Sequence, residues 1–263
     1  MSSSIADNND DVISSLPDTV LCHILAFLPT KHAIATSVLS KRWTHLWRSV
    51  LVINFGEDVC RFHEEEKLIS FNDFLNSVLL SRDSSSIKSF RLHVSYNNGD
   101  NNLDIIAFPS LVKWVEHVVK HNVESLDLCV YCNKGMPKLS NSVLTCRTLV
   151  VLKLNGFAVN GFSSVRLPSL KILSIGYSTL SSSRDFLLLL AGCPILEDLF
   201  VYKLKFYSND SLNYQECENL DLRRLNKANM PRTYCHFPLK ALHNVREMHI
   251  ELNKVCHLLL LYE

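Results

Sequence analysis

The six residues Leu149-Val150-Val151-Leu152-Lys153-Leu154 set the pattern on which the fold of this chain depends. Their leucines form the frame L-x-x-L-x-L. With other large apolar residues in some of its positions, the frame begins again at Ile87, Val123, Leu170, Leu196 and Val245. A weaker copy begins at Leu222 and ends on Lys227, which is not apolar. Alternation of apolar and polar side chains is typical of a strand with one buried face, so the frames predict a series of short strands.

The spacing of the frames predicts how these strands are arranged. Frames that begin at 123, 149, 170, 196, 222 and 245 fit the roughly 20–29-residue period of leucine-rich repeats. The longer interval from 87 to 123 contains a helix-like segment at 110–121, and residues 184–191 are a second predicted helix. Since one copy cannot build a core alone, we expect residues 51–263 to form an irregular leucine-rich-repeat solenoid in an α/β chain. The alternative is a generic α/β domain with leucine-rich strands.

A compact block of three helices is predicted before the repeats, in residues 12–50. Pro17 suits the first position of a helix, where its missing N–H costs nothing. Thr30 and Ser40 are expected to cap the second and third helices. Trp43 and Trp47 lie four residues apart and therefore share one helix face. The block is short for so many large apolar side chains, so some of them are expected on a surface that meets a partner.

The motifs of this block carry a family resemblance. They are Leu16-Pro17-Asp18, Ile24-Leu25, Leu28-Pro29, the run from Ser37 to Trp43, and Leu46-Trp47. This series resembles the F-box of plant F-box/LRR proteins, including the group with an FBD region. The segment from Cys193 to Leu199 resembles the repeat start of the same family. Such relatives continue further, whereas this chain ends in the apolar stretch 258–263 without an obvious capping repeat. We therefore expect a shortened form, or a last strand covered by another element.

The resemblance implies a function and a partner. An F-box docks on a Skp-family adaptor, which links it to a cullin scaffold, a RING subunit and a ubiquitin-conjugating enzyme. By resemblance, this chain is the non-catalytic substrate-receptor subunit of a Skp-cullin-F-box type ubiquitin ligase, and its repeats hold the target protein. The residues that would form or support the adaptor surface are Leu16, Pro17, Ile24, Leu25, Leu28, Pro29, Val38, Leu39, Trp43 and Trp47. The alternative is a leucine-rich-repeat scaffold on which the helical block acts only as a cap.

Target binding is expected at the outward positions of the strands, which alternate with the buried leucines. The candidates are Lys153, Asn155, Asp198, Phe200, Tyr202 and Arg224. Phe200 and Tyr202 stand out, because exposed aromatic residues are common anchors of protein interfaces. The frame at 222 places Arg224, Asn226 and Ala228 outward. The alternative for any one of these residues is simple solvation, or packing against a neighbouring strand.

Composition favours a binding protein that needs no cofactor. With 47% apolar and 20% charged residues, the 263-residue chain can bury a sizeable core. A net charge of +1 indicates no nucleic-acid partner, and seven glycines argue against a phosphate loop. Cys129-x-x-Cys132 stands alone, without a second pair at zinc spacing, and no nucleophile or metalloprotease motif is present. We therefore expect no catalytic residue, metal or cofactor.

The same sequence predicts a cytoplasmic or nuclear protein, or one found in both compartments. Residues 1–11 are polar and acidic, which predicts a flexible tail rather than a signal peptide. No apolar run approaches the ~20 residues that span a bilayer, so no membrane association is expected. The nine cysteines are scattered and odd in number, which favours free thiols in a reducing compartment over a secreted disulfide framework.

Overall fold

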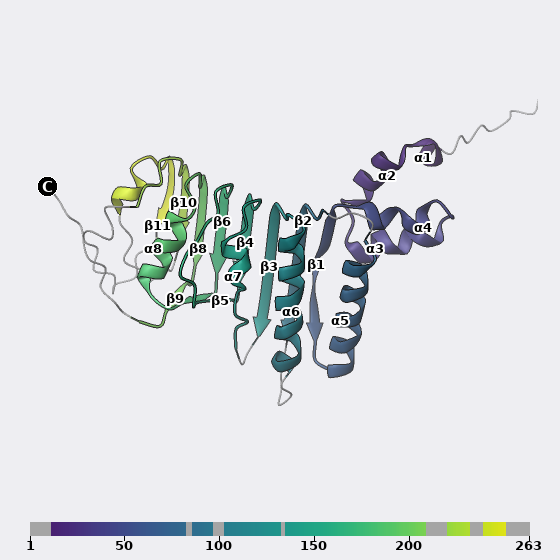
Figure 1. The fold of residues 1–263 in the computed structure, drawn as a ribbon, viewed down its shortest axis with the longest axis horizontal. Coiled ribbons are helices and arrows are strands. Elements are labelled where there is room, and N and C mark those ends of the chain that lie inside the picture. The colour runs from purple at the N-terminus through teal and green to yellow at the C-terminus, as the bar shows by residue number, and fades with distance from the viewer. Residues whose placement is uncertain are drawn as a thin grey trace, which may run out of the picture.

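The computed structural model describes residues 12–82, 86–96, 103–132, 135–208, 220–231 and 239–250. The expected tail at 1–11 and the apolar stretch at 258–263 lie outside these ranges. Short helices come first, with 3-10 turns η1 and η2 among them, and a long run of strands and helices follows (Figure 1). The N-terminal elements are α1 (Val12–Ser15), α2 (Asp18–Leu25), α3 (Thr30–Ala35), η1 (Thr36–Val38), α4 (Trp43–Leu46) and η2 (Trp47–Ser49).

One large sheet holds a strand from each repeat frame. Its strands are β1 (Val52–Phe62), β2 (Ser89–Tyr96), β3 (Ser125–Cys132), β4 (Val151–Asn155), β6 (Ile172–Gly176), β8 (Asp198–Tyr202), β10 (Lys227–Met230) and β11 (Glu247–Ile250). They lie in chain order, and every neighbouring pair is parallel. Chain order with parallel pairing means that each repeat adds one strand beside the last, as the frame spacing predicted.

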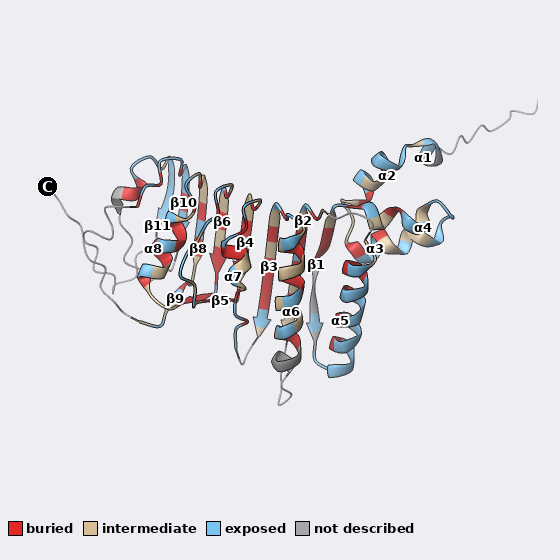
Figure 2. Ribbon diagram, in the orientation of Figure 1, coloured by how far each residue is buried: buried red, intermediate tan, exposed pale blue. Residues whose placement is uncertain are grey.

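The register of the sheet aligns the frames with one another. Leu126 lies beside Leu152, Leu152 beside Leu173, and Leu173 beside Leu199. All four are almost completely buried. Figure 2 shows buried positions along the middle strands of the large sheet. Full burial of one leucine contributes roughly 1.5–3 kcal/mol, so this row is a major source of stability and also fixes the register.

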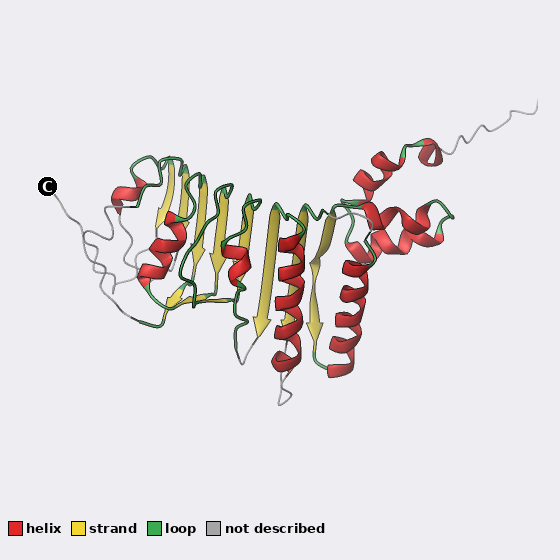
Figure 3. Cartoon of the chain, in the orientation of Figure 1, coloured by secondary structure: helices red, strands yellow, loops and turns green. Residues whose placement is uncertain are grey.

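Helices cover one face of the sheet (Figure 3). They are α5 (Glu65–Leu80), α6 (Leu103–Lys120), α7 (Asn141–Leu144) and α8 (Ser183–Ala191); a 3-10 turn, η3, spans Leu239–Leu242. The predicted helices at 110–121 and 184–191 are confirmed as parts of α6 and α8. A second, smaller parallel sheet joins β5 (Ala158–Val159), β7 (Thr179–Leu180) and β9 (Lys205–Phe206), which follow β4, β6 and β8.

The frame predicted at Leu222 is wrong by three residues. Ala228 pairs with Leu199 in the sheet and is 1% exposed, so it points into the core and not outward. Arg224 and Asn226 precede β10 and do not lie on a strand. The true frame is Leu225-Asn226-Lys227-Ala228-Asn229-Met230. Ala and Met stand at its leucine positions, and a search for leucine spacing therefore prefers the earlier residues.

The expected caps at Thr30 and Ser40 are also wrong. Pro29 precedes α3 at its N-cap position, and Thr30 is the first helical residue. Its hydroxyl instead accepts a hydrogen bond from the backbone N–H of Asn54 at 2.8 Å, across the junction between α3 and β1. Helix α4 begins after Arg42, without a side-chain cap. The polar side chain at the start of α3 thus serves tertiary contact and not the helix end.

Candidate adaptor and target surfaces

The helical block has its own small core. Leu21, Leu25, Ala33, Leu46 and Val50 are buried there. Four partly buried residues pack against this cluster: Leu16, Leu28, Trp43 and Trp47. Trp47 packs against the large core of the sheet as well, and so does Ile34. Of the predicted adaptor residues, Leu25 is therefore a core residue, and Leu16, Leu28, Trp43 and Trp47 support the block from partly buried positions.

Several large apolar side chains of the block remain exposed although this core is filled. Ile24 is 44% exposed, Leu39 65% and Val38 87%. Pro17 is also exposed, and Pro29 is half-buried. Val38 is the last residue of η1, and Leu39 follows it at the start of the segment that leads to α4. These are the predicted adaptor residues that the structure places on the surface.

The most exposed aromatic side chain of the block was not predicted. Phe27 is 71% exposed and packs edge-on against His23, with ring centroids 5.2 Å apart. Val20, Ile24 and Phe27 are spaced by four and three residues, so they follow one side of α2 and its last turn, and each is at least 40% exposed. Phe27 falls two residues after the core residue Leu25 and therefore points away from the buried face of α2, but which face is buried is set by the packing of the block.

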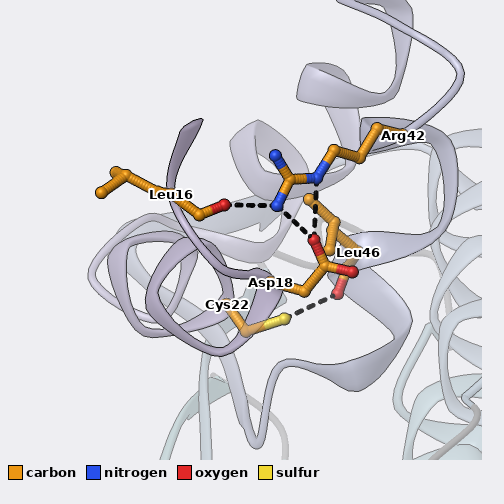
Figure 4. A network of polar contacts seen from close by, with 5 residues as sticks. All are labelled: Leu16, Asp18, Cys22, Arg42 and Leu46. Atoms are coloured by element: carbon orange, nitrogen blue, oxygen red, sulfur yellow. Dashed lines mark hydrogen bonds and ion pairs between the residues drawn. The ribbon is translucent and has the colours of Figure 1, made fainter. Parts of the chain in front are cut away.

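An ion pair holds the start of α2 against the turn before α4 (Figure 4). The Arg42 guanidinium donates to Asp18 Oδ1 from Nε at 2.8 Å and from Nη2 at 2.6 Å. Nη2 also donates to the backbone carbonyl of Leu16. One arginine therefore positions the Leu16-Pro17-Asp18 segment, a role that the local spacing of residues in the sequence does not indicate.

A thiol adds a second link between the same elements. Cys22 Sγ donates to the carbonyl of Leu46 at 3.5 Å (Figure 4). Burial, and next the Asp18 carboxylate, raise the pKa of the Cys22 thiol. The thiol therefore stays protonated at neutral pH and remains a donor.

One face of the large sheet is not covered by helices, and we call it the bare face. It carries a group of charged and polar side chains on the neighbouring strands β2 and β3. Asp127 accepts from Arg91 Nε and contacts His93 Nε2, both at 3.1 Å. Burial raises the pKa of Asp127, but the His93 hydrogen bond and the charges of His93, Arg91 and Lys153 outweigh it, so the pKa is lowered overall. The carboxylate thus stays ionised and is paired with the basic side chains of Arg91 and His93 on this face.

The predicted target residues fall into two groups. Lys153, Asn155, Asp198, Phe200 and Tyr202 are outward positions of β4 and β8, where Lys153 is exposed and Phe200 is 39% exposed. Their side chains share the bare face, because outward positions of paired parallel strands align. Arg224 does not join them, since it lies in a turn before β10.

Two residues just beyond the strands extend this surface and were not predicted. Tyr177 and Lys203 directly follow β6 and β8. The Lys203 ammonium lies 4.8 Å from the ring centroid of Tyr177 and 5.3 Å from that of Tyr202. The two tyrosine rings meet edge-on with centroids 5.1 Å apart. A search for strand alternation cannot find these positions, because both lie past the strand ends.

Within the described part of the chain, no three His, Cys, Asp or Glu side chains are grouped so as to hold a metal ion. The same residues include no helix with the length and apolar character needed to cross a membrane.

The chain thus combines a helical block that exposes apolar side chains with a parallel sheet that adds one strand per repeat. Comparison with known families agrees with both parts. The F-box domain model matches residues 13–54, and the leucine-rich-repeat model of the FBD-associated F-box protein At5g56370 matches residues 111–229.

Individual relatives from Arabidopsis thaliana extend this likeness. The chain is 38% identical to the F-box/LRR-repeat protein At4g14096 over 192 residues, which cover 72% of this chain and 39% of that protein. It is 37% identical to the F-box/LRR-repeat protein At4g14103 over 202 residues, or 75% of this chain and 51% of that protein. The F-box/FBD/LRR-repeat protein At1g78750 is 34% identical over 195 residues, with coverage of 72% and 41%. The chain belongs to this family of F-box/LRR-repeat proteins, and its match spans about half or less of each relative's length.

Proposed function

We propose that this chain is the substrate receptor of a Skp-cullin-F-box type ubiquitin ligase. The observation that carries the proposal is the exposure of Phe27, Val38 and Leu39 on a helical block whose own core is already filled. Exposed apolar side chains gathered on a small block are typical of an interaction site. The F-box match and the F-box/LRR relatives support a Skp-family adaptor as the partner.

In this proposal the two parts of the chain have separate tasks. Residues 12–50 dock on the adaptor, and residues from 51 onward form a leucine-rich-repeat solenoid whose bare sheet face holds the target. The receptor makes no bond itself; it raises the concentration of the target near a charged ubiquitin-conjugating enzyme. The work would take place in the cytoplasm, in the nucleus or in both.

The contact between the two parts supports this division of labour. Ile34 and Trp47 of the helical block pack against the core of the sheet, and Asn54 of β1 bonds to Thr30 of α3. Arg82 adds a hydrogen bond to the carbonyl of Val50, at the end of the block. A target on the sheet would therefore sit at a fixed place relative to the adaptor, which favours productive transfer over loose tethering.

The test is a binding assay between the full chain and a purified Skp-family adaptor. Phe27→Ala and Leu39→Ala remove exposed side chains, so these variants should fold as the parent does and bind the adaptor much more weakly. Leu80→Ala is the matched control, because Leu80 is 79% exposed on α5 and lies outside the helical block. The Leu16→Ala/Pro17→Ala pair is a less clean test, since Leu16 packs against the small core.

Loss of binding in the two block variants, with full binding by Leu80→Ala, would support the receptor function. A folded parent chain that does not bind the adaptor would leave the helical block as a cap on a repeat scaffold.

A further inference from the structure

The two ends of the strands in the large sheet differ in charge. At the amino ends, lysines and glutamates of neighbouring strands pair: Lys171 with Glu197 at 3.0 Å, and Lys227 with Glu247 at 2.9 Å. Lys88 lies 4.0 Å from Glu124 in the same arrangement. Charges at the amino ends therefore neutralise one another within the chain.

The carboxyl ends of β3 to β9 are different. We call residues 129–132, 155–160, 176–182 and 202–208 the carboxyl edge. The carboxyl edge contains Lys203 and Lys205 and no Asp or Glu. It also contains four tyrosines, of which Tyr131, Tyr177 and Tyr207 are 42–72% exposed and Tyr202 is half-buried. The edge is thus basic and aromatic, and its own residues supply no carboxylate to the lysines.

Backbone strain at the carboxyl edge singles out two of these residues. Three successive repeats turn at the same point with positive φ: Gly156 at 80°, Tyr177 at 45° and Lys203 at 49°. The hydrogen bonds are equivalent too, since the Gly156 N–H donates to the Gly176 carbonyl and the Tyr177 N–H to the Tyr202 carbonyl. Glycine adopts this conformation without steric cost, whereas Tyr and Lys do not. Residues held in a strained backbone conformation cluster at functional sites.

The strained turns place a cation among phenol groups. Lys203 Nζ lies above the rings of Tyr177 and Tyr202 and 3.5 Å from the Tyr177 hydroxyl. Tyr131 belongs to the same edge; a hydrogen bond with Cys129, and then the charge of that thiol when ionised, raise the pKa of Tyr131 to about 12. Its hydroxyl is therefore protonated at neutral pH. The cluster offers one ammonium and several hydroxyl donors to a ligand.

We propose that the carboxyl edge binds an acidic, extended segment of the target protein, with Lys203 as the central contact. This inference rests on the proposed receptor function and specifies the chemistry of the target. A carboxylate fits because it accepts from both ammonium and phenol donors, and charge-assisted bonds are the stronger ones. Nucleic acid fits less well, because Lys203 already lies above the Tyr177 and Tyr202 rings and occupies part of the ring surface that base stacking needs.

The experiment is selection of a displayed library of random twelve-residue peptides on the full chain. The parent chain should enrich Asp and Glu, and the enrichment should fade at high salt because exposed charges are screened. Lys203→Glu should lose this enrichment. Lys203→Gln should bind the selected peptides about two- to fivefold more weakly, the size expected for one exposed charge. Lys113→Glu is the control: it makes the same charge change at an exposed position on α6.

Each outcome decides the inference. Acidic enrichment by the parent and by Lys113→Glu, but not by Lys203→Glu, supports it. No acidic enrichment, or equal enrichment by Lys203→Glu with an unchanged melting curve, overturns it. Retention of a labelled twelve-nucleotide oligo-dT without peptide enrichment overturns it in favour of nucleic acid. Adaptor binding measured on the same preparations separates the two proposals, because none of these lysines lies in the helical block.

Discussion

The backbone N–H of Asn54 donates to the hydroxyl oxygen of Thr30 at 2.8 Å, and both residues are more than 90% buried. This bond joins helix α3 of the F-box to the first strand of the repeats. In Thr30→Val the acceptor is lost while the shape of the side chain is kept, which leaves a buried N–H without that partner. The free energy of unfolding should fall by about 1–3 kcal/mol, measured by urea denaturation.

Thr36→Val is the matched control for that change. Its hydroxyl donates to the carbonyl of Ala33 within the same short helical segment, at 2.7 Å. Loss of this local and half-buried bond should cost less than about 1 kcal/mol. Equal losses of unfolding free energy in the two variants would contradict the larger contribution that we expect from the bond between α3 and β1.

Arg42 should affect docking more than stability. Arg42→Met removes the donors to Asp18 and Leu16, but the side chains of the Arg42–Asp18 pair are 35% and 64% exposed. The free energy of unfolding should therefore fall by less than about 1 kcal/mol. Adaptor affinity should fall about three- to tenfold, because the Leu16-Pro17 segment is no longer held in place before binding. Titration calorimetry with the adaptor measures this, and Lys41→Met is the control; an unchanged affinity would count against the positioning role.

Asp127 makes the sheet sensitive to acid. Its pKa in the folded chain is lowered from 3.8 despite burial, chiefly through His93. A lowered folded pKa means that the ionised carboxylate stabilises the fold above about pH 4, and that this contribution is lost as the pH falls from there through the folded pKa. Asp127→Asn should be less stable than the parent at neutral pH, and the difference should shrink below about pH 4. Parallel melting curves across pH 2.5–7 check this; a constant difference would contradict it.

Gly156 should tolerate no side chain. Its φ is 80°, and an added Cβ would lie 1.9 Å from the carbonyl oxygen of Val130. Gly156→Ala should therefore lower the free energy of unfolding by more than about 2 kcal/mol, through strain and backbone displacement. Gly135→Ala is the control, since a Cβ there meets nothing closer than 3.8 Å. Thermal unfolding of both variants checks the prediction, and similar melting temperatures would refute it.

Much of the fold was predictable because burial leaves a periodic trace in the sequence. The frames at Leu149, Leu170 and Leu196 gave the right strands and faces, since each places a leucine in the same buried row. The frame near Leu222 was misplaced because Ala228 and Met230 occupy that row without the leucine signature.

The surfaces were less predictable than the core. Exposure of Phe27 depends on how α2 packs against α4, and the Arg42–Asp18 pair joins residues 24 positions apart. Tyr177 and Lys203 meet only because consecutive repeats stack their turns. Short-range spacing carries no information on such contacts, because it reports local periodicity and not which turns become neighbours.

The sequence by itself indicated an F-box block and a series of leucine frames whose hydrophobic period specifies short strands with one buried face, one per repeat. Only the tertiary structure decided which apolar residues of the block remain exposed once its core is filled, and which charges find partners. Hydrophobic burial is encoded locally in the spacing of leucines, whereas ion pairs and exposed clusters such as Lys203 with its two tyrosines arise between segments distant along the chain.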